Sequence, residues 1–176
     1  MRTTELRLAG TGGQGLILAA RLLADALLQG GRHVAQSQSY EPTSRGGPSR
    51  ADLVVGDGPV DYPLATALDA LVLLDGAALL DAPRLLRPGA AVIADAERAA
   101  DIAVSGTTAV LLPLCRTART LGNERVANIV ALGALNGRLD LCPRASLEAA
   151  IRAGVPRRFL DLNLEALAAG YRLAAA

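Results

Sequence analysis

One short segment narrows the folds open to this chain, the glycine-rich run Gly10-Thr11-Gly12-Gly13-Gln14-Gly15. It matches the pattern G-x-G-x-x-G and lies between a strand pattern at 5–9 and a run of strong helix formers at 16–29. In that setting the first glycine makes a tight turn, the second lets a ligand approach the backbone, and the third lets helix and strand pack closely. Amides at the helix start can then hold an anion such as phosphate. The segment predicts a strand, a loop and a helix of the α/β class.

The strand that follows the loop does not identify the ligand that the loop would bind. A dinucleotide site needs an acidic residue at the end of the second strand, but the strand pattern at 33–38 ends in Gln36-Ser37-Gln38. The first acid is Glu41, in the next loop, and Arg32 precedes the strand rather than ending it. The glycines therefore either bind a ligand or only turn the chain. The Gln14 amide at the helix mouth could bond a ligand or a neighbouring subunit.

Strand and helix patterns alternate along the rest of the chain. Residues 1–38 read as a β-α-β unit. Runs of mostly consecutive apolar residues, typical of parallel strands covered by helices, indicate the later strands. Further strands are expected at 49–56, 69–74, 90–94 and 109–112, and helices at 123–139, at 146–153 with Ser146 as N-cap, and at 157–174. No repeat or composition break divides the chain. We expect residues 1–176 to form a single Rossmann-like, doubly wound α/β domain with a mainly parallel sheet and helices on both faces.

Composition excludes several classes of partner. The net charge is +1 and aromatic residues make up 2% of the chain, so neither a basic surface nor a stacking platform for nucleic acid is expected. The longest uncharged stretch, 102–115, is too short and too broken for a membrane span, which needs roughly 18 residues. No signal peptide is apparent, because Glu5 and Arg7 interrupt the region where its apolar stretch would lie. We expect a cytoplasmic protein that binds neither nucleic acid nor membrane.

Metal and catalytic residues are scarce. Cys115 and Cys142 form no CxxC pair and are distant in sequence from His33, the one histidine, so both are expected to be buried thiols. His33 begins a strand and is expected to be structural. We expect no metal site and no catalytic residue in this chain. Because every basic residue is arginine, a bound phosphate or carboxylate would be held by arginine, backbone amides or neutral polar groups.

The loop at 39–52 is the most polar segment between two strands. Arg45 beside Gly46-Gly47 would present a guanidinium next to open backbone, which suits a carboxylate, a phosphate or the approach of another chain. Ser44 adds a hydroxyl. The alternative is a solvated loop whose glycines only turn the chain.

These segments form a recognisable combination. GTGGQG follows the first strand, SY-x-P-x-x-RGG-x-S-R-A-D follows the second, Asp69 opens the next strand, and NxVALGAL spans 128–135. Together with an N-x-x-A-x-x-x-G pattern from Asn163 to Gly170, they resemble the gamma subunit, or gamma domain, of the 2-oxoacid:ferredoxin oxidoreductases. The resemblance covers nearly the whole chain. One departure is Glu41, where the family commonly has glycine, and its effect on the Arg45 loop is left open.

The resemblance implies a non-redox subunit of a larger enzyme. Alpha- and beta-type subunits, with a ferredoxin-like delta subunit in some complexes, would carry thiamine diphosphate, magnesium and iron–sulfur clusters, and ferredoxin would accept the electrons. The gamma portion would hold none of these cofactors alone and would contact coenzyme A and support assembly. Neither the 2-oxoacid nor the subunit stoichiometry is indicated. An independent NAD(P) oxidoreductase and a non-enzymatic nucleotide-binding scaffold are the alternatives.

The residues expected to contact a ligand lie in two loops and one helix that meet at the carboxyl ends of the strands. Asn128 would come from the helix, where a capping or packing role is equally compatible. The full set is Gly10, Gly12, Gly13, Gln14, Gly15, Ser37, Ser44, Arg45, Gly46, Gly47 and Asn128.

Overall fold

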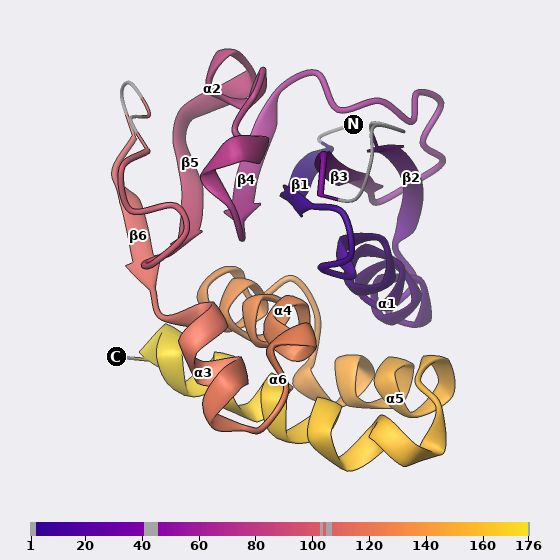
Figure 1. The fold of residues 1–176 in the computed structure, drawn as a ribbon. Helices are drawn as coiled ribbons and strands as arrows, with labels where there is room; N and C mark the ends of the chain where they lie inside the picture. Colours follow the sequence, from indigo (N-terminus) through magenta and orange to yellow (C-terminus); the bar gives the residue numbers. More distant parts are fainter. Residues whose placement is uncertain (1–2, 41–45, 103, 105–106, 176) are drawn as a thin grey trace.

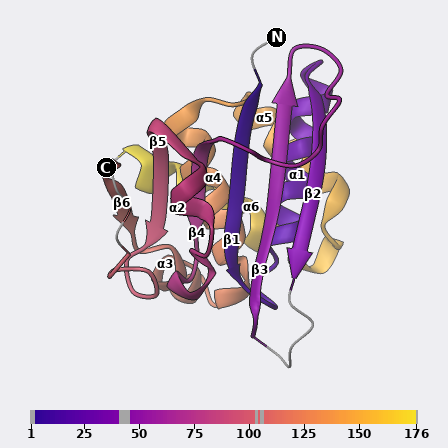
Figure 2. The ribbon, with the colours of Figure 1, turned by 90° about the horizontal axis from the view of Figure 1, so that it is seen from above.

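The computed structural model describes residues 3–40, 46–102, 104 and 107–175. Its six strands form one sheet in the order β2-β3-β1-β4-β5-β6 (Figure 2). The strands are β1 (Thr4–Thr11), β2 (His33–Tyr40), β3 (Pro48–Gly56), β4 (Leu68–Leu73), β5 (Leu86–Asp95) and β6 (Ala109–Leu112). The β1–β4, β4–β5 and β5–β6 pairs are parallel, whereas β3 runs antiparallel to both β1 and β2. The expected mainly parallel α/β sheet is confirmed, with β3 as its one reversed strand.

The β-α-β unit forms at the start of the chain, but another strand is inserted into it. Strands β1 and β2 run parallel to each other, because each is antiparallel to β3 between them. Residues 41–47 join β2 to β3, and a parallel crossover needs about a dozen residues or more. This connection therefore makes a hairpin, which reverses β3.

The helices are divided unequally between the two faces of the sheet. They are α1 (Leu16–Gln29), η1 (Gly76–Ala78), α2 (Ala82–Leu85), α3 (Leu114–Thr120), η2 (Glu124–Val126), α4 (Ala127–Leu139), α5 (Arg144–Gly154), η3 (Arg157–Phe159) and α6 (Leu160–Ala175). Figure 1 shows all the long helices below the sheet, with the short α2 above it. Both faces are covered, but the helix-rich face carries most of the core.

Two helix starts differ from the sequence pattern. The helix expected from residue 123 opens as the 3-10 turn η2, with the Asn123 side chain accepting a hydrogen bond from the Arg125 amide at 3.0 Å. The prediction that Ser146 is an N-cap is wrong: α5 begins at Arg144 and Pro143 takes the N-cap position. Proline can begin a helix because its missing N–H is not needed there. The Ser146 amide donates to the Pro143 carbonyl at 2.9 Å instead.

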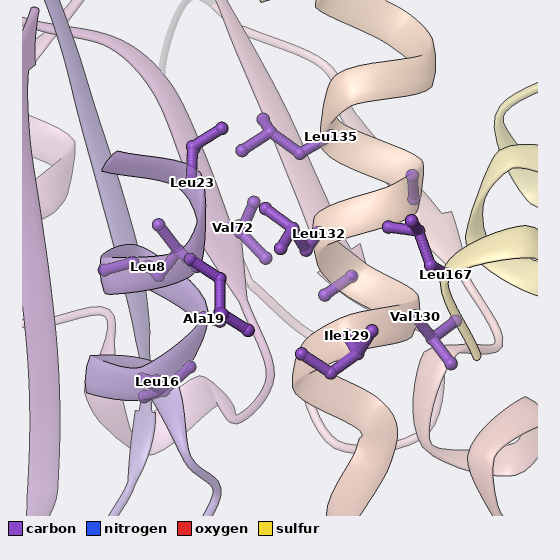
Figure 3. Close-up of a cluster of buried hydrophobic side chains, with 14 of the residues drawn as sticks. Leu8, Leu16, Ala19, Leu23, Val72, Ile129, Val130, Leu132, Leu135 and Leu167 are labelled. Atoms are coloured by element: carbon purple, nitrogen blue, oxygen red, sulfur yellow. The ribbon is translucent and has the colours of Figure 1, made fainter. Parts of the chain in front are cut away.

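Aliphatic side chains fill the space between the sheet and the helices. Figure 3 shows Leu8 and Val72 of the sheet close to Leu23 of α1 and Leu132 of α4. All four side chains are almost fully buried. This packing fixes the start of α1 relative to the start of α4, and both helix starts lie at one edge of the sheet.

Helices α4 and α6 approach each other backbone to backbone. A Cβ atom added at Gly133 would lie 2.3 Å from the Leu167 carbonyl oxygen, and one added at Gly170 would lie 2.0 Å from the Val130 carbonyl oxygen. Only glycine fits at such distances. The glycines of the NxVALGAL and N-x-x-A-x-x-x-G patterns therefore serve helix packing.

The other face of the sheet holds a buried ion-pair network. Arg7 of β1 is 2% exposed and binds the Asp52 carboxylate with two nitrogens, each at 2.8 Å. A third nitrogen of Arg7 donates to Asp81 at 2.7 Å, and Arg50 donates to the same Asp81 oxygen at 2.8 Å. The S-R-A-D segment thus joins β3 to β1 and to the residue that precedes α2.

Candidate functional site

The carboxyl ends of the parallel strands lie at one edge of the sheet, as parallel pairing requires. Strands β1, β4, β5 and β6 end there at Thr11, Leu73, Asp95 and Leu112. The glycine loop, the turn after β5 and the starts of α1, α3 and α4 follow at the same edge. Ligands of open α/β sheets bind at this edge.

The glycine loop is closed by its own glutamine. The Gln14 amide donates to the Thr11 carbonyl at 3.2 Å, and the Gln14 side-chain oxygen accepts from the Thr11 amide at 2.7 Å. A Cβ atom at Gly10 would lie 2.2 Å from that oxygen. Gly13 and Gly15 have φ angles of 93° and 71°, in the left-handed region that favours glycine. Gln14 therefore folds back over Gly10, and its oxygen stabilises the loop.

The β2–β3 hairpin meets the glycine loop through its glycines. The Gly12 amide donates to the Gly47 carbonyl at 2.9 Å, and Gly46 has a φ of 109°. A Cβ at Gly12 would stay 3.7 Å from both Gly46 and Gly47, which is ordinary contact. Ser44 and Arg45 lie outside the described residues. Of the expected hairpin contacts, Gly46 and Gly47 are thus placed beside the glycine loop.

Ser37 lies elsewhere on the sheet. In the β2–β3 register it stands opposite Asp52, whose carboxylate binds Arg7. Its neighbour is therefore the ion-pair network, and β3 separates it from β1.

Asn128 ties α4 to the glycine loop. Its side-chain nitrogen donates to the Gly15 carbonyl at 2.8 Å, and the residue is 4% exposed. A Cβ at Gly15 would lie 2.6 Å from this nitrogen. Of the two roles open from the sequence, positioning of the backbone is the one with a hydrogen bond in the structure.

A polar hollow of about 320 Å³ opens beside the loop. Its lining combines residues 11–14 with Arg98, Cys115, Glu124, Arg125 and Ala127. Arg98 forms an ion pair with Glu124, whereas Arg125 is exposed and makes no ion pair with the described part of the chain. The Gly13 amide likewise donates to no described acceptor. The hollow therefore offers an anion the Arg125 guanidinium and the Gly13 amide, together with Arg98, whose charge is offset by Glu124 in the same lining.

A second, more apolar hollow of about 340 Å³ adjoins the first and shares Gly13 and Arg125 with it. Its remaining lining is Gly15, Leu18, Asn123, Val126, Asn128, Val155, Pro156, Phe159, Leu162 and Asn163. Together the two hollows could take a ligand that has an anionic part and a neutral part.

Asp95 holds in place two segments that line the polar hollow, the turn before Arg98 and the start of α3. It is fully buried, and one of its oxygens accepts from the Glu97 and Arg98 amides at 3.0 and 2.9 Å. The other oxygen accepts from the Cys115 amide at 2.8 Å, at the start of α3. This carboxylate thus fixes the turn that carries Arg98.

Both cysteines are free and buried, as expected. Burial, with a smaller contribution from Asp95, raises the pKa of the Cys115 thiol to about 12. Burial, with Asp140 nearby, raises the pKa of Cys142 to about 11. Since the thiolate is the nucleophile, neither sulfur is prepared for attack at neutral pH.

Arg98 and Arg125 were missed from the sequence. No short motif contains them, and in a chain whose basic residues are all arginine a single one stands out little. The usable signal was position, because Arg98 follows the end of a buried strand, where ligand contacts gather. His33, at the start of β2, lies at the opposite end of that strand from the hairpin.

Two further features bear on ligands and location. Within the described residues, no three side chains of His, Cys, Asp or Glu gather as they would around a metal ion. Among the described helices, none is both long enough and apolar enough to cross a membrane.

Comparison with known proteins gives a consistent result. The family described as pyruvate ferredoxin/flavodoxin oxidoreductase matches residues 5–173. The 2-oxoglutarate synthase subunit KorC of Methanothermobacter thermautotrophicus is 37% identical over 96% of this chain and 94% of its own length. The crystal structure of the keto/oxoacid ferredoxin oxidoreductase gamma subunit from Geobacter sulfurreducens matches with a TM-score of 0.89 and 34% identity, over 99% of this chain and 98% of that one.

A larger enzyme contains the same fold as one part of a chain. The 2-oxoglutarate:ferredoxin oxidoreductase from Magnetococcus marinus, solved with 2-oxoglutarate, coenzyme A and succinyl-CoA bound, matches with a TM-score of 0.86. The match covers 99% of this chain and 31% of that chain at 24% identity. At this identity the likeness concerns the fold alone.

Proposed function

The chain belongs to the pyruvate ferredoxin/flavodoxin oxidoreductase family, and we propose that it is the gamma-type subunit of a multi-subunit 2-oxoacid:ferredoxin oxidoreductase in the cytoplasm. The observation that carries the proposal is the end-to-end match to a gamma subunit, in sequence and in fold. Oxidative decarboxylation of the 2-oxoacid takes place on alpha- and beta-type partner subunits. Thiamine diphosphate, magnesium and iron–sulfur clusters on those partners supply the chemistry, and ferredoxin receives the electrons.

The part of the reaction assigned to this chain is the handling of coenzyme A. Coenzyme A carries phosphates and a long neutral arm, which fit a polar hollow whose two arginines outnumber its one glutamate and an adjoining apolar hollow. Arg98, Arg125 and the Gly13 amide would bind the phosphates. Ser44 and Arg45 stay candidates from the sequence. The arm would lie over Phe159 and Leu162.

Co-purification from the native cell tests the subunit assignment. An affinity tag on this chain should bring down larger alpha- and beta-type subunits, and the eluate should reduce a viologen dye when given a 2-oxoacid and coenzyme A. Four relatives named 2-oxoglutarate synthase subunit KorC make 2-oxoglutarate the first substrate to test. Recovery of the chain without such partners would refute the assignment.

Steady-state kinetics of the same complex tests the coenzyme A assignment. Arg125→Ala should raise the KM for coenzyme A about tenfold, as expected for one lost charged contact, and leave the KM for the 2-oxoacid unchanged. Arg116→Ala is the matched control, because Arg116 is exposed on α3 outside both hollows. Equal kinetics for the two variants would rule out this binding site.

The order of the strands argues against the alternative that this chain is an independent nicotinamide-dependent enzyme. In a dinucleotide fold the residue that binds the ribose ends the strand next to β1. Here β3 occupies that place, and β2 lies about 9–10 Å from β1, twice the strand spacing. Titration of the purified chain with NAD and NADP in a calorimeter should give no heat of binding.

A further inference from the structure

The outer edge of β2 is the longest open strand edge in the described structure. β2 ends the sheet on one side with eight residues, whereas β6 ends it on the other side with four (Figure 2). No described strand pairs with the outer side of β2. Such an edge presents alternate N–H and C=O groups to any strand that arrives.

Within its eight described residues, β2 lacks the charges, prolines and bulges that usually protect an edge strand. Its sequence, HVAQSQSY, contains no lysine, arginine, acid or proline. Its register with β3 runs from His33 opposite Gly56 to Tyr40 opposite Ser49 without a bulge. Proteins ordinarily shield exposed edges with charges, prolines, bulges or short strands, and β6 is short. β2 therefore has the character of a strand that is paired in the assembled protein.

We propose that β2 pairs antiparallel with β2 of a second copy of this chain, across a two-fold axis perpendicular to the sheet. The six-stranded sheet would then continue into that of the partner. The strand is compatible with itself, because its uncharged side chains place no like charges opposite each other. The inference is independent of the proposed function.

The faces of β2 restrict the register of this pairing. Val34 packs against the helix-side core, whereas Ser39 lies with Arg50 and Leu80 on the other face. Even-numbered residues of β2 thus face the helices and odd-numbered residues face away. An axis perpendicular to the sheet keeps both helix layers on one side, so opposite residues must share a face.

The axis must therefore lie midway between one residue and the same residue of the partner subunit, and the two residues nearest the middle of the strand are Gln36 and Ser37. With the axis at Gln36, this side chain faces its own copy. With the axis at Ser37, Gln36 faces Gln38 of the partner subunit. In either register, a chain substituted at both Gln36 and Gln38 would therefore place a substituted residue opposite a substituted residue of the partner subunit.

Light scattering after size-exclusion chromatography of the full chain, over a range of concentrations, tests the proposal. The unmodified chain should have the mass of two chains at high concentration. Q36K/Q38K places lysine opposite lysine and should weaken the dimer about tenfold or more. Q36E/Q38E should do the same, and a mixture of the two variants should recover the dimer. Q29K/A149K is the control, because it adds the same charge at exposed helix positions.

Three outcomes would overturn the proposal. The first is the mass of one chain at every concentration. The second is a dimer that the lysine and glutamate variants leave unchanged, since its interface would lie elsewhere. The third is protection of the β2 amides from hydrogen exchange only when a larger partner subunit is added, since the strand on this edge would then come from that partner. None of these outcomes would affect the co-purification test, so failure of the β2 pairing is distinguishable from failure of the proposed function.

Discussion

Gly12 and Gly15 belong to one motif but meet different constraints. Gly15 has a φ of 71°, and a Cβ there would lie 2.6 Å from the Asn128 side chain. Gly12 has no such φ, and its Cβ would meet nothing closer than 3.7 Å. The fold therefore requires the glycine at 15, whereas it tolerates a methyl group at 12. What remains for Gly12 is access to the backbone at the edge of the polar hollow.

Alanine at these two positions should separate the two roles. Gly15→Ala should lower the free energy of unfolding by about 2–4 kcal/mol, because it combines backbone strain with loss of the Asn128 hydrogen bond. Gly12→Ala should stay within about 0.5 kcal/mol of the unmodified chain. Urea denaturation followed by circular dichroism measures both. A larger loss for Gly12→Ala than for Gly15→Ala would contradict the geometry of the loop.

The Asp81 carboxylate makes stability depend on acid pH. Burial disfavours its charge, but Arg7 and Arg50 outweigh that effect and hold its pKa below the ordinary value of 3.8. Its stabilising contribution is therefore complete above about pH 4 and is lost as the pH falls through the lowered pKa. Asp81→Asn should flatten the acid limb of the stability curve measured by urea denaturation. An unchanged slope in this variant would show that Asp81 takes no part in the network.

Some of the residues that approach the loop could be predicted, although Ser37 lies beside the ion-pair network instead and Arg98 and Arg125 were missed. The hydrogen-bond partners of the predicted residues could not be deduced. The G-x-G-x-x-G pattern placed the turn correctly between β1 and α1, and the RGG pattern placed Gly46 and Gly47 in a loop. The partner of Gln14 could not be deduced, because a long amide can bond a ligand or its own backbone with equal ease. Asn128 lies 113 residues from Gly15, and only the packing of α4 on α1 brings the two together.

At the level of elements, the α4–α6 pair depends most on small residues. The two helices exchange close contacts through Gly133 and Gly170, where the nearest atoms are backbone and cannot move aside. At Gly137 the nearest atoms belong to the side chains of Ala174 and Tyr171, close to the end of α6. The same Gly→Ala change should therefore have unequal effects along one helix pair.

Gly170→Ala should cost about 3 kcal/mol or more of stability, since the helices must separate to admit the methyl group. Gly137→Ala should cost less, about 1 kcal/mol, because the fixed Ala174 Cβ that it meets lies one residue from the end of α6, where the backbone can shift, and because alanine favours helix. Thermal unfolding monitored by calorimetry gives both values. Equal destabilisation would mean that backbone contact is not what limits the approach of α4 and α6.

Strand and helix positions followed from hydrophobic patterns, but strand direction did not. Continuous apolar runs predict burial on both faces, and β4 fits this, yet similar runs in β3 belong to an antiparallel strand. The signal for direction was loop length, since residues 41–47 are too few for a crossover. Ser146 resembled an N-cap by residue type, but Pro143 already provided a helix start three residues earlier.

The whole molecule is a sheet with two unlike faces and two unlike edges. One face carries most of the aliphatic core with the long helices (Figure 1), and the other carries the Arg7–Asp52–Asp81 network, which includes the residue before α2. The two hollows lie at the carboxyl edge, where segments far apart in sequence meet. β2 offers an open strand at a lateral edge. The proposed coenzyme site and the proposed β2 pairing would therefore occupy separate parts of the molecule.

Reconstitution of the oxidoreductase with and without this chain tests the central claim most directly. Partner subunits are expressed alone, the purified chain is added, and ferredoxin reduction is followed in the presence of the 2-oxoacid and coenzyme A. We predict that coenzyme A-dependent activity appears only when the chain is present and saturates at a fixed ratio of chain to partner subunits. Full activity in its absence, or no association of the chain with the partners, would contradict its assignment as the gamma-type subunit.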